Sequence, residues 1–137
     1  MEKKGVIILL FLTVSFLSCK KFIEQQEQNA LIKVMTNGVW VVSKYFENDT
    51  DISNSFTGYN FQFYSNGTVT GTKNTVSVNG IWAGDISNRT ITSNFPTAGD
   101  PVAKLNAVWT ITDSYTDSVS AKTTINSYIN KLELKKH

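Results

Sequence analysis

The chain has 137 residues, with 13 basic and 11 acidic side chains, a formal net charge of +2 and a single cysteine. The balanced charge and the single arginine, Arg89, argue against a nucleic-acid partner, because binding to a phosphate backbone needs concentrated Lys and Arg. One cysteine excludes an internal disulfide, so the domain must be stabilised by packing, for which it has eight Phe, five Tyr and three Trp.

The N-terminal segment has the order of a bacterial lipoprotein signal peptide. Lys3 and Lys4 precede an apolar run that ends at Ser18, directly before Cys19. The apolar run is shorter than the ~20 residues that a bilayer-spanning helix needs. We predict that residues 1–18 are removed on export and that Cys19 becomes the lipid-bearing first residue of the mature chain, which would have 119 of the 137 residues.

Residues 22–36 have the period of an amphipathic helix. Apolar side chains recur at helical spacing from Phe22 to Met35, while charged and amide side chains fill the other face. Asn37 and Gly38 tolerate the left-handed conformation at which helices often end. We therefore predict a lipidated N-terminus and helix over 19–37, followed by a β-domain over 38–137.

From Val39 onward the apolar period changes to two, and turn residues arrive at intervals of about eight to twelve residues. Asn66-Gly67 predicts a tight hairpin with a primed two-residue turn. Asn79-Gly80 lies inside a continuing alternation, so Gly80 instead predicts a bulge or a close backbone approach. The predicted strands cover residues 39–47, 57–65, 68–74, 76–83, 88–94, 105–113, 115–122 and 125–135.

The alternation also predicts which side chains face the core, with Thr, Ser, Asn and Lys opposite them, as in an antiparallel sheet with one wet face. The predicted inward residues are Trp40, Val42, Tyr59, Phe61, Phe63, Val69, Val76, Val78, Trp82, Ile91, Leu105, Ala107, Trp109, Ile111, Leu132 and Leu134. Strand 39–47 is ambiguous, because Val41 and Tyr45 are as apolar as Trp40 and Val42; a helix covering its outer side would explain this. Eight meandering strands close most simply into an all-β, up-and-down barrel, and a two-layer β-sandwich is the alternative.

Several short motifs resemble the lipocalins. Gly38-Val39-Trp40 is similar to their Gly-x-Trp signature, and the segments 59–69, 80–82 and 105–111 look like the small lipocalin-like lipoproteins of Bacteroidetes-type bacteria. The second signature, Thr-Asp-Tyr, is interrupted here by Ser114. The third is a basic residue on the last strand that packs over the first-strand Trp, a role that Lys131 or Lys135 could fill by a cation–π contact.

The resemblance implies a barrel that holds a small apolar molecule. Such an interior is either filled by its own side chains or keeps one small guest. A guest would contact aromatic, uncharged side chains, so it would itself be apolar or a flat ring. The candidate ligand-binding residues are Trp40, Phe61, Phe63, Trp82 and Trp109.

Metal binding and catalysis have little support in the sequence. The acidic stretch 47–53 has oxygen ligands at alternate positions, but counting from Asp49 the sixth and twelfth places of a calcium loop are Asn54 and Asn60, not Gly and Glu. The only histidine is His137, the last residue, and no nucleophile motif occurs. We predict no metal, no cofactor and no enzymatic activity.

Asp117-Ser118-Val119 is similar to the O-glycosylation acceptor of Bacteroidetes-type bacteria, which makes Ser118 a candidate glycan site. Lipoproteins that these bacteria send to the cell surface resemble one another in acidic residues after the cysteine, whereas Cys19 is followed by Lys20 and Lys21. We therefore predict lipid anchoring in the bacterial cell envelope, in the outer membrane and facing the periplasm.

Two functions follow from these observations. One is a membrane-tethered binding module for an apolar small molecule or an envelope component. The other is a protein-interaction or inhibitory module with a solid core, whose function lies on outer loops such as 47–56 and 94–104 and whose partner the sequence does not name.

Overall fold

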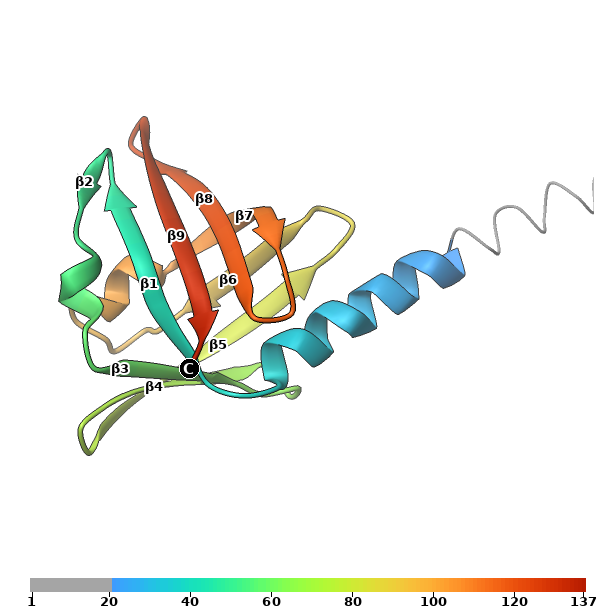
Figure 1. Cartoon of the computed structure of the whole chain (residues 1–137), viewed down its shortest axis with the longest axis horizontal. Helices are drawn as coiled ribbons and strands as arrows, with labels where there is room; N and C mark the ends of the chain where they lie inside the picture. The colour runs from blue at the N-terminus through green and yellow to red at the C-terminus, as the bar shows by residue number, and fades with distance from the viewer. Residues whose placement is uncertain (1–20) are drawn as a thin grey trace, which may run out of the picture.

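The computed structural model describes residues 21–137, and it shows an N-terminal helix over residues 21–36 that leads into a β-barrel (Figure 1). The side chains of residues 21–27 are exposed, and the helix buries side chains only in its last turns, at Leu31 and Met35. Every buried side chain of the described range lies between Leu31 and Leu134, and the apolar ones form one cluster. Within this range no helix is both long enough and apolar enough to cross a bilayer.

The barrel is closed. Each strand pairs antiparallel with the next in the order β2-β1-β3-β4-β5-β6-β7-β8-β9, and β1 also pairs with β9 along its whole length. The fold is thus an eight-stranded, lipocalin-like up-and-down barrel with a short extra strand, β2, as predicted, and the β-sandwich alternative is wrong. The strands are β1 (Trp40–Glu47), β2 (Thr50–Asp51), β3 (Tyr59–Phe63), β4 (Thr68–Lys73), β5 (Val76–Asp85), β6 (Thr90–Asn94), β7 (Ala107–Ser114), β8 (Ser118–Ile125) and β9 (Tyr128–Lys136).

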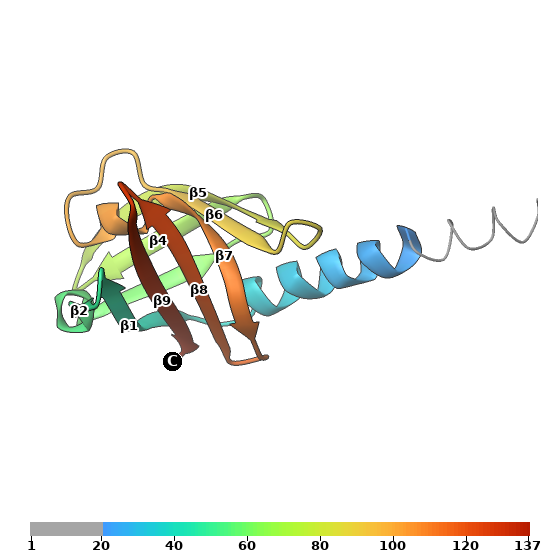
Figure 2. The same ribbon diagram turned by 90° about the horizontal axis from the view of Figure 1, so that it is seen from above.

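The helix docks on one end of the barrel (Figure 2). The Gln28 side chain donates to the carbonyl of Gly84 (2.7 Å) and accepts from the amide of Ile86 (2.8 Å), which ties the helix to the β5–β6 turn. Trp40 Nε1 donates to the carbonyl of Met35 (2.9 Å), so the end of the helix is also bonded to the start of β1. These contacts place the helix at the end of the barrel, so it does not explain the apolar outer positions of β1.

A β-bulge resolves the ambiguity of this strand. The register with β9 shifts between Val42 and Lys44, which leaves Ser43 as the extra residue. Trp40 and Val42 therefore point inward before the bulge and Tyr45 points inward after it, although they do not share one two-residue period. All three side chains belong to the same core.

The two Asn-Gly pairs have the different roles that the sequence predicts, with one correction. Asn66-Gly67 closes the β3–β4 hairpin, but in the described chain only Gly67 of this pair has positive φ (+87°), so the turn is not of the primed two-residue type. β5 runs through Gly80 without a register shift. This unbroken register rules out the bulge. A Cβ at Gly80 would lie 2.6 Å from the carbonyl oxygen of Asn94 and 2.7 Å from the Phe95 ring, which confirms the close backbone approach.

The core is larger than the alternation predicts. Val76, predicted to face inward, is 73% exposed at the start of β5, because the strand extends beyond the packed part of the barrel there. Buried residues that the strand period did not reveal come from the helix, from two short 3-10 turns, η1 (Ser53–Phe56) and η2 (Val102–Leu105), from the β6–β7 connection and from β8. They are Leu31, Met35, Phe56, Phe95, Val102, Val119 and Ala121.

Candidate functional site

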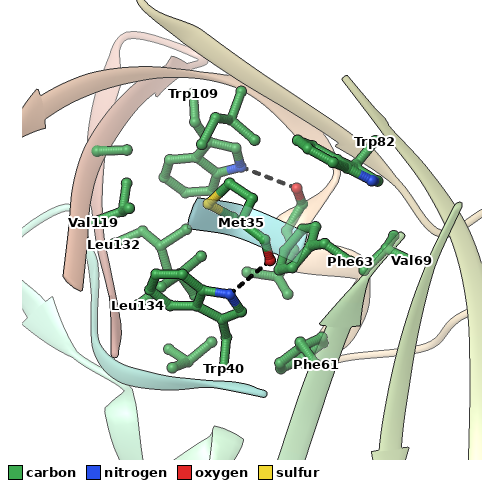
Figure 3. Packing of buried hydrophobic residues seen from close by; sticks show 14 of the residues in the cluster. Met35, Trp40, Phe61, Phe63, Val69, Trp82, Trp109, Val119, Leu132 and Leu134 are labelled. Atoms are coloured by element: carbon green, nitrogen blue, oxygen red, sulfur yellow. Dashed lines mark hydrogen bonds between the residues drawn. The ribbon is translucent and has the colours of Figure 1, made fainter. Parts of the chain in front are cut away.

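The five predicted interior residues come together as expected. Trp40, Phe61, Phe63, Trp82 and Trp109 are all buried and belong to one cluster (Figure 3). Each indole N–H is bonded to a backbone carbonyl, that of Trp82 to Tyr64 (2.8 Å) and that of Trp109 to Leu105 (3.0 Å). These bonds hold the rings in fixed positions, because a buried donor without a partner would be costly.

The barrel interior is nearly full. The cavity among Phe61, Phe63, Phe95 and Trp109 has a volume of about 30 Å³, which holds roughly one or two water molecules. Pockets for drug-sized ligands have roughly 300–1,000 Å³. Of the two interpretations of the interior, this structure matches the filled one. A ligand-binding role for the five aromatic residues stays a prediction, and it would require the interior to expand.

The side chains that fill the interior come partly from outside the strands. Met35 enters from the helix and is completely buried (Figure 3). Phe95, from the β6–β7 connection, packs edge-on against Phe61 with a centroid distance of 6.1 Å. The helical period placed Met35 on an apolar face but did not show that it enters the barrel, and Phe95 was missed because it does not follow the strand period.

The opposite end of the barrel, which we call the mouth, has an open groove. Antiparallel alternation places the β1–β2, β4–β5, β6–β7 and β8–β9 connections at the mouth, and the helix with the remaining turns at the other end (Figure 1). The groove has a volume of about 500 Å³. It is lined by Tyr45, Glu47, Asn48, Thr50, Ala103, Lys104, Asn106, Ile125, Asn126, Tyr128 and Asn130.

Tyr45 connects the mouth to the core. Its ring stacks on Phe56 at 5.3 Å and meets Trp109 edge-on at 5.8 Å. Its hydroxyl donates to the carbonyl of Lys104 (2.8 Å). Burial, reinforced by the charge of Glu47, raises the pKa of Tyr45 to about 12, so the hydroxyl stays a neutral donor at physiological pH.

The other polar groups of the mouth are also held in place. Lys104 Nζ donates to Glu47 Oε2 at 2.5 Å, and this bond raises the pKa of Lys104. Asn130 is the only buried polar residue of the described chain, and its Oδ1 accepts from the backbone N–H of Asn48 (3.2 Å). Asn130 lies between Tyr128 and Leu132 on the inward face of β9. Its side-chain amide therefore interrupts a series of otherwise apolar or aromatic inward residues. That interruption is the sequence signal that could have revealed the mouth.

The groove combines fixed hydrogen-bonding groups with apolar surface. Tyr128 is 55% exposed and Ile125 is 40% exposed at the β8–β9 hairpin, and both belong to the groove lining. A ligand with several hydroxyl or amide groups and one flat apolar face matches this lining, because each kind of surface then meets its complement.

Comparison with solved structures supports the fold. The chain is similar to a DUF4847 family protein from Bacteroides vulgatus, with a TM-score of 0.56 and 13% sequence identity over 78% of this chain and 97% of that one. That likeness concerns the fold alone. The solved protein comes from the group of bacteria to which the sequence resemblance also points. No family model matches the chain, and no curated protein matches its sequence.

A basic residue of the last strand does pack over Trp40, but it is another residue than predicted. Lys131 and Lys135 are exposed on the outer face of β9, so neither covers Trp40. Lys136, which is the direct cross-strand partner of Trp40, places its Nζ 5.3 Å from the indole centroid.

The remaining candidates are placed as follows. Cys19 and the predicted signal lie outside the described residues. Ser118 is half-buried at the first position of β8, and its glycosylation stays a prediction. In the acidic stretch 47–53, Asp51 Oδ1 accepts from the hydroxyl and the backbone N–H of Ser53, and these bonds lower the pKa of Asp51. Within residues 21–137 no group of three or more His, Cys, Asp or Glu side chains is placed to hold a metal ion.

Proposed function

We propose that the protein is a non-enzymatic binding module that is tethered to the bacterial envelope through a lipid on Cys19 and takes its ligand at the mouth of the barrel. The observation that carries this proposal is the contrast between the two spaces: about 500 Å³ at the mouth and about 30 Å³ in the interior. Of these two spaces, only the mouth has the size of a ligand site.

The lining of the mouth supports a polar ligand. Lys104 and Glu47 form an ion pair and so neutralise each other's charge. A strongly charged ligand would therefore gain little binding energy from them. The amides around Asn130 and the exposed ring of Tyr128 suit vicinal hydroxyls and a flat apolar face, respectively. A neutral sugar of the envelope has both features.

The tether is supported by the sequence order at Cys19 and by the direction of the helix. The helix leads away from the barrel at the end opposite the mouth (Figure 1). A lipid-bearing residue just before the helix would therefore leave the mouth uncovered. The lysines after Cys19 support a position in the outer membrane, facing the periplasm.

The alternative, a protein-interaction module, concerns the same place. Loops 47–56 and 94–104, which the sequence suggests as interaction sites, both reach the mouth and contribute Glu47, Asn48 and Lys104 to the groove. A protein partner would therefore compete with a small ligand for one surface. Ligand binding at the mouth is favoured, because the groove is concave and its polar groups are fixed.

The proposal is tested with the domain of residues 21–137, which contains the closed barrel and the hydrophobic cluster inside it. Amide chemical shifts are recorded during titration with a panel of neutral oligosaccharides and, separately, with a fatty acid. We expect a sugar to shift the signals of Asn48, Asn126 and Asn130. Tyr128→Ala should weaken that binding about ten-fold, as expected for a stacked ring. Tyr115→Ala is the matched control, because Tyr115 is 63% exposed at the other end of the barrel.

Two results would contradict a site at the mouth. Shifts of the Trp82 and Trp109 signals with the fatty acid alone would place the ligand in the interior. No response to any probe, together with specific capture of an envelope protein that Tyr128→Ala abolishes, would favour the interaction module. The tether is tested separately in cells: Cys19→Ala should release the protein from the membrane fraction, and retention there would disprove lipidation.

A further inference from the structure

One wall of the barrel concentrates positive charge. The outward-facing positions of β1, β9 and β8 carry four exposed lysines, and Glu133 is the one carboxylate among them. We call this surface the lysine wall. Its lysines are Lys44, Lys122, Lys131 and Lys135.

The strand register places like charges next to each other on the wall. Lys131 is the direct cross-strand partner of Lys122 on one side and of Phe46 on the other. Like charges directly opposite each other destabilise a sheet. Among residues 21–137, no carboxylate lies within salt-bridge distance of Lys44, Lys122 or Lys131. The register also places Lys44 directly opposite Glu133, so the direct like-charge contact is the pair Lys122 and Lys131. This pair works against stability, and a partner that supplies negative charge would explain it.

The surface between these lysines is hollow and partly apolar. A depression of about 420 Å³ is bordered by Lys44, Lys122 and Lys131, and its lining also includes Phe46, Ser120 and one carboxylate, that of Glu133. Ile129, 49% exposed, continues the outer face of β9 beyond Lys131. Lysines mixed with aromatic and aliphatic side chains are typical of surfaces that lie at a membrane interface.

We propose that the lysine wall docks on an anionic phospholipid surface, with Lys44, Lys122 and Lys131 receiving headgroup phosphates around the depression. The inference rests on the proposed function in one respect, namely that the lipid on Cys19 keeps the domain beside a bilayer. A tether raises the effective concentration of that surface, so weak contacts of a few lysines are sufficient. For this reason a membrane is favoured over a soluble acidic protein.

This orientation has a consequence for the mouth. The wall runs along the side of the barrel, parallel to β1, β8 and β9, whereas the mouth is at the end of these strands (Figures 1 and 2). With the wall on the bilayer, the mouth opens along the membrane surface. The groove could then reach ligands that are themselves anchored in that membrane.

The test uses the domain of residues 21–137 without lipid, so its outcome is independent of the Cys19→Ala experiment. Co-sedimentation is measured with vesicles of phosphatidylcholine alone and with vesicles that also contain phosphatidylglycerol. We expect binding only to the mixed vesicles, weaker at high salt. The double variant Lys122→Gln/Lys131→Gln should lower the partition coefficient about 25-fold, that is, about five-fold for each lysine. The control Lys33→Gln/Arg89→Gln removes the same charge from exposed sites elsewhere and should leave binding unchanged.

A loss of binding in the double variant would not come from unfolding. Removing a like-charge pair should keep or raise the thermal midpoint of unfolding, and thermal denaturation of the double variant checks this. Equal binding to both kinds of vesicle would overturn the proposal. So would an equal loss in the control variant, which would show an effect of net charge alone. Binding to an acidic peptide or polysaccharide without binding to the mixed vesicles would assign the wall to another partner and reject the membrane.

Discussion

The Nζ of Lys136 on the last strand lies 5.3 Å from the centroid of the Trp40 indole on the first, across the pair that closes the barrel. The Trp40 ring is completely buried and its N–H is bonded to the end of the helix. The two residues therefore join three parts of the chain, the helix, β1 and β9, at one point.

Replacing Lys136 should weaken this junction. Lys136→Leu keeps the apolar stem but removes the cation, so we expect the free energy of unfolding to fall by ~0.5–1 kcal/mol. Lys136→Arg retains the charge over the ring and should stay close to the parent protein. Urea denaturation of both variants measures the difference, and equal stability of Lys136→Leu and the parent would show that the contact contributes nothing.

Gly80 is a position where a single methyl group should be costly. A Cβ would lie 2.6 Å from the carbonyl oxygen of Asn94 and 2.7 Å from the Phe95 ring. Gly80→Ala should therefore destabilise the protein by ~1–3 kcal/mol, because the core must move to accept it. Gly99→Ala is the matched control, since nothing lies within 4 Å of a Cβ there. Similar midpoints for the two variants in thermal denaturation would refute the close approach.

The docking of the helix should depend on one amide side chain. Gln28→Ala removes both hydrogen bonds to the β5–β6 turn, at Gly84 and Ile86. We expect a loss of ~1–2 kcal/mol and faster amide hydrogen exchange in the last turns of the helix. Gln25→Ala, at an exposed position of the same helix, is the control. Unchanged exchange in Gln28→Ala would mean that packing at Leu31 and Met35 is sufficient to hold the helix.

Tyr45 should make the protein sensitive to alkali. Its pKa is about 12 in the folded state and near 10 in the unfolded chain. Its stabilising effect is therefore complete below pH 10 and is lost as pH rises toward 12, because the unfolded chain releases the proton first. The loss over this window is ~2–3 kcal/mol. Urea denaturation at several alkaline pH values measures it, with Tyr45→Phe as the control. If Tyr45→Phe loses stability as steeply as the parent, another group causes the effect.

Local patterns were sufficient for most of the barrel. The period-two alternation located all eight long strands. The continuing pattern around Gly80 correctly excluded a turn and left a bulge or a close backbone approach, of which the structure has the second. The pattern failed where the chain leaves its period. Val76 continues the alternation beyond the packed part of the barrel, while Phe56 and Phe95 lie in connections and pack inward across the mouth.

The candidate site was harder to predict for the same reason. The five aromatic residues of the interior follow the strand period, so the sequence identified them, but it did not show how little space they leave. That depended on Met35 and Phe95, which enter from outside the sheet. The mouth groove draws on three separate segments of the chain, around Tyr45, around Lys104 and from Ile125 to Asn130, and no sequence window contains them together.

The sequence by itself determined the strands, their antiparallel order and the aromatic character of the core, because hydrophobic period and turn chemistry act over a few residues. Only the tertiary structure decided that the interior is filled, that Ser43 changes the phase of β1, and that Lys136 is the cation over Trp40. These features depend on barrel closure, which brings β1 and β9 together from opposite ends of the β-domain and sets which side chains compete for the same space.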